Sequence, residues 1–569
     1  MKAVRRKSAL AIGLAASTLA AAATLPWTQP HTRALQTDTL EQCLVDARLH
    51  VVSQQLSDAA IYFQASASDN LMFHYNPHAV VFANNADQVQ QAVKCAAAQN
   101  PPVAIAARSG GHSFASFGSG GMDGSLIIDL ANMSSIDSQP QLNIVDVQPG
   151  ARLGDIIKQL WHQHGARRAM NTGTCPTVGA GGLSLCGGFG PMSRHWGLTT
   201  DNILEADLVL ANGSQITVTE TQNTDVMWGL RGAGAFFGIV TRFRYRTHDA
   251  GDPIIFFDMQ WTPSITSPDV GVRLLSAIQA FGIAKDLDTK LGFHVQLKRP
   301  TVTDPQPAEG RHVAIHMRGA YLGSLNGWAE LRQRFAHHLN KHKAPAPDLD
   351  VEQQATYLAT MEAWDDFGEP GDKLNTEKEH KLHNNYVVKS SLTLDSRKGF
   401  KKHAWKDLLQ FLWDTGFEPG RNEVLADGTS VMWAWNIYLE LFGGGMPAYR
   451  HPDKVKAGSF ANRDGLWLIQ IAVGTTSTMT LAPSGHAYAF ATDRQVNKAI
   501  KDSGLQRAGY SCYVDPDLPE HEWKQLYYGP SLHRLEDLKM DLDPRNIFRN
   551  PQSLGSKKQI LEQRNLKSQ

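Results

Sequence analysis

The hydrophobic pattern of the first half of the chain predicts helices and strands in alternation. Residues 86–99 space their apolar side chains as an amphipathic helix does, and the apolar run at 103–107 is typical of a buried strand. A turn signal at Asn212-Gly213 predicts a hairpin within 201–220. Further elements are expected as strands at 125–130, 142–150 and 238–247 and as helices at 152–165 and 223–229. This alternation predicts an α+β or α/β unit that closes near residue 248.

From residue 251 onward the pattern changes to long helical segments and continuous apolar strands. Residues 322–343 predict a helix, while 431–444 and 465–474 have the pattern of strands. A chain of 569 residues is too long for one ordinary hydrophobic core. We therefore expect at least one further domain after the first.

The first residues have the pattern of an export signal. Residues 2–7 carry four positive charges, an apolar run covers 9–25, and small residues at 20–23 provide cleavage sites. A membrane anchor is the alternative, but the run is short and ends at Pro26. We expect residues 1–23 to be a signal peptide, and the protein to be secreted rather than held in a membrane.

Composition limits the partners and the redox chemistry. Hydrophobic residues make up 42% of the chain, and its 55 basic and 55 acidic side chains balance, so no nucleic-acid partner is expected. Five cysteines leave at least one outside any internal disulfide. Cys43 and Cys95 lie on predicted helices and are the disulfide candidates. Asn132 and Asn212 begin sequons that permit glycosylation.

We expect the protein to be a monomer and to have no metal site.

The first chemical motif is a glycine-rich turn, Arg108-Ser-Gly-Gly-His112, directly after a predicted strand. Adjacent glycines let backbone N–H groups approach a pyrophosphate without side-chain obstruction. A tight turn with an incidental histidine is the alternative. The dinucleotide fingerprint of a Rossmann fold is absent, because Ser184 stands where its third glycine belongs.

The second motif, Thr174-Cys-Pro-Thr-Val-Gly-Ala-Gly-Gly182, places a cysteine on another glycine-rich loop. In an exported protein with an odd cysteine count, Cys175 is available for a bond other than a disulfide. Together with His112 it offers two nucleophilic side chains to one planar cofactor.

These motifs resemble the berberine-bridge-enzyme-like branch of the vanillyl-alcohol-oxidase flavoproteins, and within it the fungal glucooligosaccharide-oxidase type. The matching segments occur in the family's order at 108–113, 175–182, 196–203, 228–241 and 548–553. The resemblance implies FAD bonded through its 8α-methyl to His112 and through C6 to Cys175. Such tethering fixes the flavin and raises its potential. Cys186 is the rival for the second bond, but the family often has glycine there, so we expect a buried thiol.

The resemblance also implies an architecture. We expect an α+β protein with a bipartite FAD-binding domain over 36–250, its PCMH-type part at about 75–248, and a substrate domain over 251–500. That second domain should have an antiparallel sheet flanked by helices, and a C-terminal segment over 501–569 should complete the flavin site. The expected cofactor contacts, besides the two tethers, are Arg108, Ser109, Gly110, Gly111, Ser113, Val178, Gly179, Gly182 and Val240. Val178 matches a position beside the flavin at which, in the family, a small side chain goes with access of oxygen. The alternative is that Val178 only fills space in the protein interior.

The third motif, Tyr510-Ser-Cys-Tyr513-Val-Asp515, resembles the family's strip in which the second tyrosine is the general base. Alternation along 436–440 places Asn436, Tyr438 and Glu440 on one face of a strand. Glu440 matches the carboxylate that partners the base. It is expected to accept the phenolic proton, because a neighbouring negative charge raises a tyrosine's pKa.

Tyr438, Asn436 and Gln470 occupy the family's sugar-contacting positions, so we expect them to contact substrate. Tyr438 and Asn436 stand where characterised sugar oxidases carry glutamine and tryptophan. Cys512 and Ser531 replace asparagines that are usual in the family. These departures leave the tyrosine chemistry intact and leave the substrate open. For Tyr510 and Tyr513 the alternative is a structural role as buried phenols.

The expected activity is oxidation of a hydroxyl-bearing carbon of an oligosaccharide at its anomeric position, with oxygen reduced to hydrogen peroxide. Within the same fold, oxidation of a phenolic or alkaloid-like metabolite is the alternative. From another class, Gly111-His-Ser113-Phe-Ala115 approximates the nucleophile elbow of an α/β-hydrolase esterase, with alanine in place of its last glycine. A carbohydrate-binding protein without catalysis is the third possibility.

Overall fold

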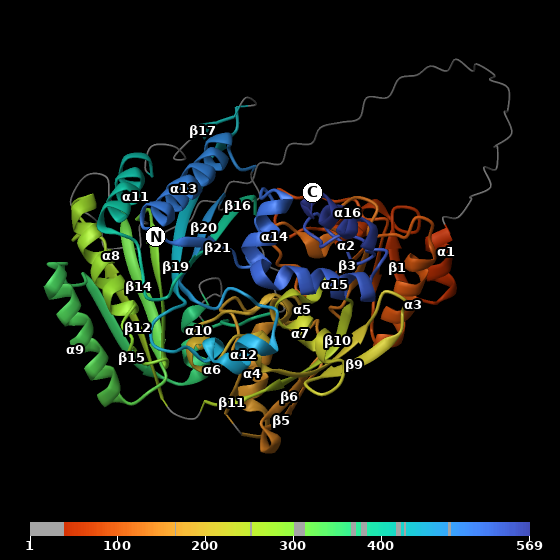
Figure 1. The fold of residues 1–569 in the computed structure, drawn as a ribbon, viewed down its shortest axis with the longest axis horizontal. Coiled ribbons are helices and arrows are strands. Elements are labelled where there is room, and N and C mark those ends of the chain that lie inside the picture. Colours follow the sequence, from red (N-terminus) through yellow and green to blue (C-terminus); the bar gives the residue numbers. More distant parts are fainter. Residues whose placement is uncertain are drawn as a thin grey trace, which may run out of the picture. The chain divides into compact units, whose positions relative to one another are not determined.

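The computed structural model describes residues 39–165, 167–250, 253–300, 313–365, 371–376, 384–416, 423–425, 428–475 and 480–568. Thr39–Gln569 forms one compact unit (Figure 1). The expected signal peptide, 1–23, lies outside the described residues. Among the described helices, none combines the length and the apolar character that crossing a membrane requires.

A four-stranded sheet begins the unit, in the order β1-β2-β4-β3. Its strands are β1 (His50–Ser53), β2 (Ala79–Phe82), β3 (Ile105–Arg108) and β4 (Leu126–Asp129). Strand β4 runs parallel to both β2 and β3, and its side chains are buried throughout. Helices α1 (Thr39–Asp46) and α3 (Ala86–Ala98) are joined by the disulfide Cys43–Cys95, which confirms that prediction.

A five-stranded antiparallel sheet follows, in the order β5-β6-β10-β8-β9. Its strands are β5 (Ile136–Gln139), β6 (Ile144–Val147), β8 (Ile203–Val209), β9 (Gln215–Thr219) and β10 (Ile239–Arg246). The predicted hairpin is β8–β9, and Gly213 takes a φ of +77° in its turn. Helices α4 (Leu153–His162) and α7 (Thr224–Ala233) match the predicted helices. The glycine-dense region contains a short helix that was not expected, α5 (Ala180–Cys186).

The second half builds an eight-stranded antiparallel sheet, in the order β15-β12-β14-β13-β19-β20-β16-β21. Its strands are β12 (Ile254–Trp261), β13 (Leu291–Lys298), β14 (Ala314–Tyr321), β15 (Leu349–Ala355), β16 (Tyr386–Leu394), β19 (Trp433–Leu441), β20 (Gly465–Thr475) and β21 (Gln506–Ala508). Four helices pack beside it (Figure 1): α8 (Pro268–Gly282), α9 (Leu325–His342), α11 (Lys402–Thr415) and α13 (Pro483–Asp502).

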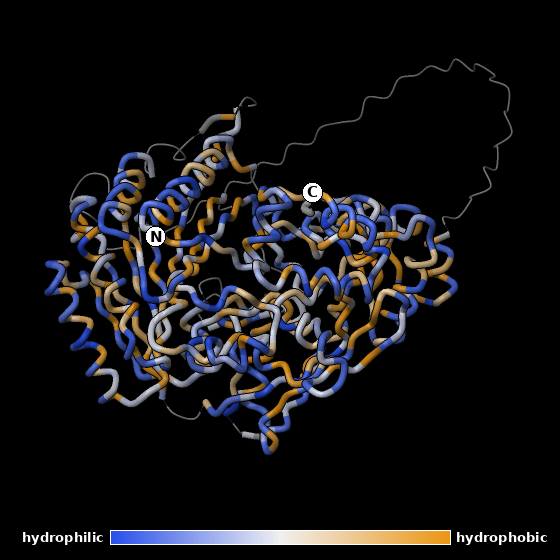
Figure 2. Tube along the Cα trace, in the orientation of Figure 1, coloured by the Kyte–Doolittle hydropathy of each residue, from blue (hydrophilic) through white to orange (hydrophobic). Residues whose placement is uncertain are grey.

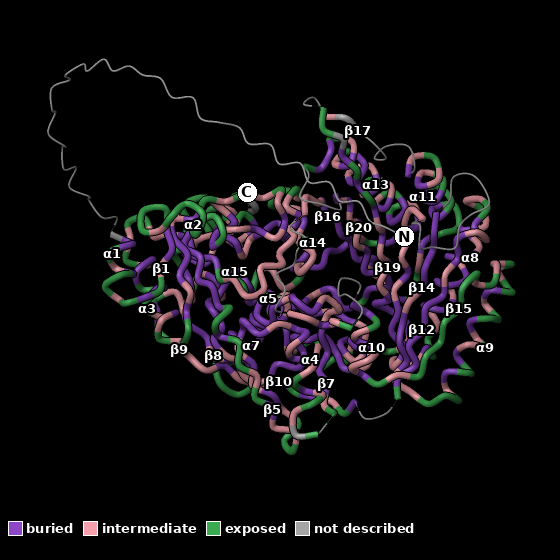
Figure 3. The backbone as a smooth tube through the Cα atoms, turned by 180° about the vertical axis from the view of Figure 1, so that it is seen from behind, coloured by how far each residue is buried: buried purple, intermediate pink, exposed green. Residues whose placement is uncertain are grey.

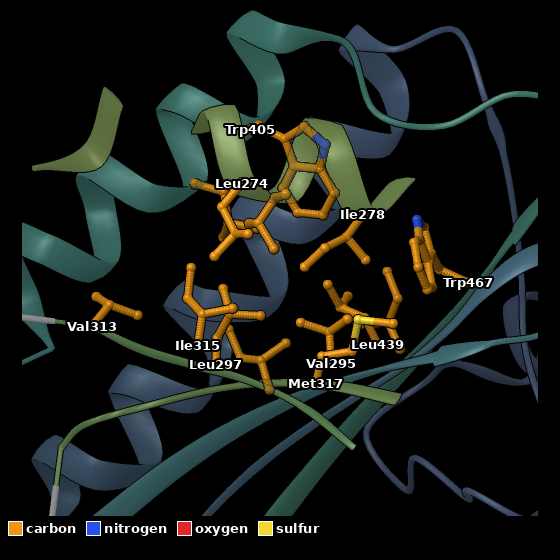
Figure 4. Packing of buried hydrophobic residues seen from close by; sticks show 14 of the residues in the cluster. Leu274, Ile278, Val295, Leu297, Val313, Ile315, Met317, Trp405, Leu439 and Trp467 are labelled. Carbon is orange, nitrogen blue, oxygen red and sulfur yellow. The ribbon is translucent and has the colours of Figure 1, made fainter. Parts of the chain in front are cut away.

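The two faces of this sheet differ in chemistry. Its helix-covered face forms the largest apolar core, where Leu274 and Trp405 meet strand residues such as Val295 and Leu439 (Figure 4). In Figure 3 most residues in the strands of the sheet are buried. In Figure 2 hydrophilic and hydrophobic residues alternate along α9, because the outer face of this helix meets solvent. On β19 the buried tryptophans and aliphatic residues alternate with Asn436, Tyr438 and Glu440, as the sequence predicted. The opposite face of the sheet is therefore polar.

The C-terminal segment returns to the first part of the chain. Strand β21 extends the eight-stranded sheet through β16, and Ile105 of β3 donates its backbone N–H to Ile547 at 2.7 Å. Helices α14 (Glu520–Tyr528) and α15 (Leu532–Leu542) pack with Trp228 and Phe237. The α+β fold class is confirmed, whereas the domain boundaries within Thr39–Gln569 remain predictions.

Candidate active site

A cavity of about 1200 Å³ lies between the glycine-rich loops, the polar face of the eight-stranded sheet and the C-terminal segment. It is larger than the roughly 300–1000 Å³ of an ordinary small-molecule pocket, so a dinucleotide and a substrate can share it. Sixteen of the predicted site residues line it: His112, Cys175, Ser109, Gly110, Gly111, Ser113, Val178, Gly179, Gly182, Val240, Tyr438, Gln470, Asn436, Glu440, Tyr510 and Tyr513.

Arg108 is the predicted cofactor residue that does not line the cavity. Its Nε donates to Asp129 at 2.5 Å and its Nη2 to the carbonyl of Ala65 at 2.7 Å. Because Arg108 of β3 and Asp129 of β4 are partners in the parallel register, the pair fixes these two strands. The motif arginine therefore supports the loop rather than reaching into the cavity.

The two glycine loops contact each other directly. A Cβ on Gly110 would lie 2.2 Å from the backbone nitrogen of Gly179, which excludes any side chain there. Ser109 completes the junction, because its Oγ donates to the carbonyl of Pro149 at 2.5 Å and accepts from the N–H of Gly181 at 3.2 Å. A Cβ on Gly182, by contrast, would meet nothing within 4 Å. Some motif glycines thus serve loop packing, while Gly182 leaves space inside the cavity.

His112 and Cys175 are brought together by a residue that sequence reasoning missed. The Oγ1 of Thr177 lies 3.0 Å from Nε2 of His112 and 3.7 Å from Sγ of Cys175. Burial raises the pKa of the Cys175 thiol, and the contact with Thr177 partly opposes that rise. Among the described cysteines, Cys175 is the one outside a disulfide. One hydroxyl therefore bridges the two predicted tethering side chains.

Tyr513 and Glu440 form a hydrogen-bonded pair in the lining of the same cavity. The phenolic hydroxyl of Tyr513 donates to Oε2 of Glu440 at 3.1 Å, and Oε1 lies at 3.4 Å. Burial and the adjacent carboxylate raise the pKa of Tyr513 well above its usual value, so it is a neutral phenol at neutral pH. Burial also raises the pKa of Glu440 to about 7, against the lowering effect of the Tyr513 hydrogen bond. Glu440 can therefore accept a proton near neutral pH, whereas Tyr513 can pass on its own proton only as it receives another.

Tyr510 is placed differently from Tyr513. Its hydroxyl accepts the backbone N–H of Phe189 at 2.8 Å, and the side chain is 2% exposed. Its ring packs edge-on against the Tyr513 ring, with centroids 4.9 Å apart. These contacts hold the ring of Tyr513 in place, which agrees with the alternative that Tyr510 is a structural, buried phenol.

The prediction for Cys186 was wrong. Cys186, at the end of α5, forms a disulfide with Cys512, 326 residues later. The pair also lines the cavity, and Cys512 directly precedes Tyr513. Both positions carry cysteine where the family usually has another residue, and the two positions are far apart in the sequence. Two such unusual cysteines in one chain were the signal that could have indicated a disulfide.

The remaining predicted contacts form a polar row. Asn436 and Tyr438 both accept hydrogen bonds from Nε2 of Gln296 on the neighbouring strand, at 2.8 and 3.0 Å. Tyr438 is the register partner of Gln470 on β20. Sequence reasoning missed Gln296, together with four cationic or titratable neighbours that line the same wall: His294, Lys298, His316 and Arg318.

Ser113, the residue expected of an esterase, lines the cavity without the partners that an esterase needs. Within the described part of the chain, its buried Oγ has no hydrogen-bond partner. A serine nucleophile requires a histidine within hydrogen-bond distance to remove its proton. The geometry therefore disfavours a hydrolase.

The cavity fits the FAD that the resemblance implied. Its volume and the open space at Gly182 provide room for a dinucleotide, and the nucleophilic side chains of His112 and Cys175 lie in the lining of the same cavity. When bound, FAD would add a two-electron acceptor to this site.

Comparison with known proteins agrees with this arrangement. Residues 77–219 match the family model of an FAD binding domain, and residues 509–555 match the model described as berberine and berberine like. Over 536 residues the chain is 30% identical to a chitooligosaccharide oxidase of Gibberella zeae, covering 93% of this chain and 97% of that protein. It is 29% identical over 524 residues to an FAD-linked oxidoreductase of Metarhizium anisopliae, covering 91% of each.

The fold is also similar to a solved structure. A xylooligosaccharide oxidase from Myceliophthora thermophila, determined in complex with xylobiose, matches with a TM-score of 0.76 and 28% identity. The match covers 91% of this chain and 99% of that one.

Proposed function

Because the chain belongs to the berberine-bridge-enzyme-like FAD-linked oxidoreductases, we propose that it is a secreted oxidase of oligosaccharides that oxidises their anomeric carbon. Oxygen is the proposed acceptor, giving hydrogen peroxide, and the lactone is the proposed sugar product. The observation that carries the proposal is the Tyr513–Glu440 hydrogen bond in the cavity that His112 and Cys175 also line.

His112 and Cys175 are the proposed covalent anchors of FAD. Thr177 supports this assignment, because its hydroxyl orients the imidazole and lies beside the thiol. Each anchor requires its nucleophilic atom to lose a proton, and the Thr177 contact lowers the pKa of Cys175 against burial. FAD, when bound, would supply the two-electron acceptor that oxidation of the sugar requires.

Tyr513 is the proposed general base. An anomeric hydroxyl that donates to the Tyr513 oxygen can release its proton there while the phenolic proton passes to Glu440. The raised pKa of Glu440, about 7, makes this carboxylate a proton acceptor matched to neutral pH. Tyr513 therefore needs no stable phenolate, which burial makes costly.

Gln296, Asn436, Tyr438 and Gln470 are the proposed sugar-binding residues. The Gln296 amide holds the Asn436 carbonyl and the Tyr438 hydroxyl in fixed positions. A wall of amides and hydroxyls suits a sugar better than an aromatic metabolite, whose apolar rings need apolar contacts. This chemistry favours an oligosaccharide over the phenolic alternative.

The test is oxygen consumption by the purified yellow protein with reducing oligosaccharides, each compared with the alditol of the same sugar. The alditol lacks the anomeric centre and keeps every other unit. We expect oxygen uptake and peroxide with the sugar and none with the alditol. Equal oxidation of both, or oxidation of aromatic alcohols alone, would refute the proposal.

A further inference from the structure

The loop that carries Tyr513 is attached to an edge of the eight-stranded sheet. Among the described strands, β21 pairs with β16 on this side, and only along the last three residues of β16. Two consecutive residues earlier in β16 contact the loop: the Ser390 hydroxyl donates to the carbonyl of Tyr513 at 2.9 Å, and Nζ of Lys389 donates to Asp515 at 2.8 Å. Because neighbouring residues of a strand point to opposite faces, the loop is held on both faces of the sheet.

Lys389 and Asp515 form a buried ion pair, in which each side chain is 2% exposed. The same ammonium pairs with Asp517 at 2.5 Å and lies 4.0 Å from the centroid of the Phe490 ring. These contacts occupy the N–H donors of the ammonium with two carboxylates and an aromatic face. A buried ion pair often stabilises a fold no better than apolar residues of similar volume would, so stability alone does not explain this one.

The backbone of Asp515 is fixed as well. Its N–H donates to the hydroxyl of Tyr527 at 2.9 Å, and its carbonyl accepts from Nε2 of Gln552 at 2.7 Å. The side chain, the N–H and the carbonyl of Asp515 therefore all have partners. Since Tyr513 lies only two residues earlier, a fixed Asp515 restricts where the backbone of Tyr513 can lie.

The phenol depends on this anchoring because Tyr513 extends from one strand of the sheet to another. Its carbonyl is held at β16, its hydroxyl reaches Glu440 on β19, and β20 lies between these two strands. Neighbouring strands lie about 4.8 Å apart, which separates β16 from β19 by about 10 Å. A small rotation of the backbone at one end would therefore carry the hydroxyl at the other end away from the carboxylate.

From these contacts we propose that Lys389 is a positioning residue for the oxidation, which holds Asp515 so that the Tyr513 hydroxyl stays on Glu440. The inference rests on the proposed role of Tyr513 as the base. Lys389 lies on the helix-covered face of the sheet, beside Phe490 of α13, and is not among the residues that line the cavity. It therefore acts through the loop and not on the substrate.

The test is anaerobic reduction of the flavin-loaded enzyme by the best substrate among xylobiose, chitobiose and cellobiose. At saturating sugar we expect Lys389→Met to be slower by about tenfold or more, because the base is misplaced. Half-saturation should change by less than about twofold, since the proposed sugar-binding residues lie on other strands. The midpoint of the pH profile should move upward, because the Tyr513 hydrogen bond lowers the pKa of Glu440. Lys389→Arg keeps the charge and should recover much of the rate.

Two further variants separate positioning from stability. Lys389→Met/Asp515→Leu removes both buried charges, so it should be more stable than Lys389→Met and yet remain slow. Lys498→Met is the matched control, because Lys498 also pairs with two carboxylates, those of Asp407 and Asp502, but does not contact the loop. It should keep the normal rate and pH midpoint. A normal rate in the double variant, or failure of every Lys389 variant to fold, would make the pair purely structural and overturn the inference.

Failure of the proposed function gives a different result. If none of the three sugars reduces the flavin of the unmodified enzyme, or if Tyr513→Phe reduces its flavin at the normal rate, the proposed oxidation or its base is wrong. A slow Tyr513→Phe together with a Lys389→Met of normal rate and normal pH midpoint refutes the positioning role alone.

Discussion

Cys186 and Cys512 form a disulfide that ties the end of α5 to the residue directly before Tyr513. The backbone of Tyr513 is held from a second side, where its carbonyl accepts the Ser390 hydroxyl at 2.9 Å. The proposed base is thus fixed between the glycine-rich half of the site and the eight-stranded sheet.

Removing this disulfide should impair catalysis as well as stability. For Cys186→Ala/Cys512→Ala we expect a loss of about 2–5 kcal/mol of unfolding free energy and flavin reduction slowed by about tenfold or more. The matched control, Cys43→Ala/Cys95→Ala, removes a disulfide between α1 and α3 that does not line the cavity. Thermal unfolding and anaerobic stopped-flow measurements on both variants separate the two effects. A catalytic loss of equal size in the control would contradict a positioning role for Cys186–Cys512.

The pattern of alternation along β19 could be predicted from sequence because it depends only on the pleat of one strand. Buried Trp435 and Ile437 face the core, and this fixes Tyr438 and Glu440 toward the cavity. The pairing of Cys186 with Cys512 depends on how two distant segments pack, which no local pattern contains. Lys298 and Arg318 were missed for a related reason, since their shared face depends on which strands become neighbours.

Motif resemblance located the loops correctly but did not distinguish the tasks of their residues. Arg108 and Gly110 belong to the motif, yet one holds β4 through Asp129 and the other permits contact with Gly179. Thr177 carries no special signal in sequence, because its role depends on the distance between two loops. Sequence reasoning thus gave the composition of the site, while packing decided which atoms meet.

The cofactor anchors can be tested without measuring activity. His112→Ala and Cys175→Ala should each keep flavin attached after acid precipitation through the remaining bond, and the double variant should release it. Thr177→Val keeps the shape of the side chain but removes the bridging hydroxyl, so we expect a smaller covalently bound fraction. The flavin absorbance of the washed precipitate and of the supernatant gives the covalently bound fraction in each of the four variants. Complete release of flavin from the unmodified protein would refute both bonds.

Val178 should control access of oxygen to the reduced cofactor. It lines the cavity next to the Gly179 loop, so an added methylene should narrow the space that oxygen uses. We expect Val178→Ile to slow reoxidation by about tenfold or more, equivalent to ~1.4 kcal/mol, with flavin reduction by substrate nearly unchanged. Val178→Ala is the matched control and should reoxidise at least as fast as the unmodified enzyme. Slower reduction together with normal reoxidation in Val178→Ile would assign this residue to substrate binding.

The rate of flavin reduction should rise with pH through the titration of Glu440. Burial raises the pKa of this carboxyl to about 7, so below that pH it is largely protonated and cannot accept the Tyr513 proton. We therefore expect the reduction rate to increase between about pH 6 and 8 and then to level off. Glu440→Gln should be slow and lose this step, whereas Glu440→Asp should retain a step. A pH-independent rate in the unmodified enzyme would exclude Glu440 as the acceptor.

The role of Tyr513 as the base is tested by removing its hydroxyl alone. Tyr513→Phe leaves the ring that packs against Phe114 and Tyr510 but cannot accept or donate a proton. General-base catalysis is typically worth about 10²–10⁴-fold, and we expect a loss in this range in anaerobic flavin reduction at saturating substrate. The covalent flavin content should not change, because Tyr513 contacts neither His112 nor Cys175 through any hydrogen bond in the described part of the chain.

Tyr510→Phe provides the matched control, since it deletes the hydroxyl of the neighbouring tyrosine in the same strip. Its lost contact is the hydrogen bond from the Phe189 backbone, which supports packing rather than proton transfer. We therefore expect Tyr510→Phe to lose about 1–3 kcal/mol of stability through the unsatisfied buried donor and to reduce its flavin far faster than Tyr513→Phe. If the two variants exchanged these behaviours, Tyr510 would be the base. A near-normal rate in both would leave Glu440 to accept the substrate proton directly, and Glu440→Gln would then show the largest loss.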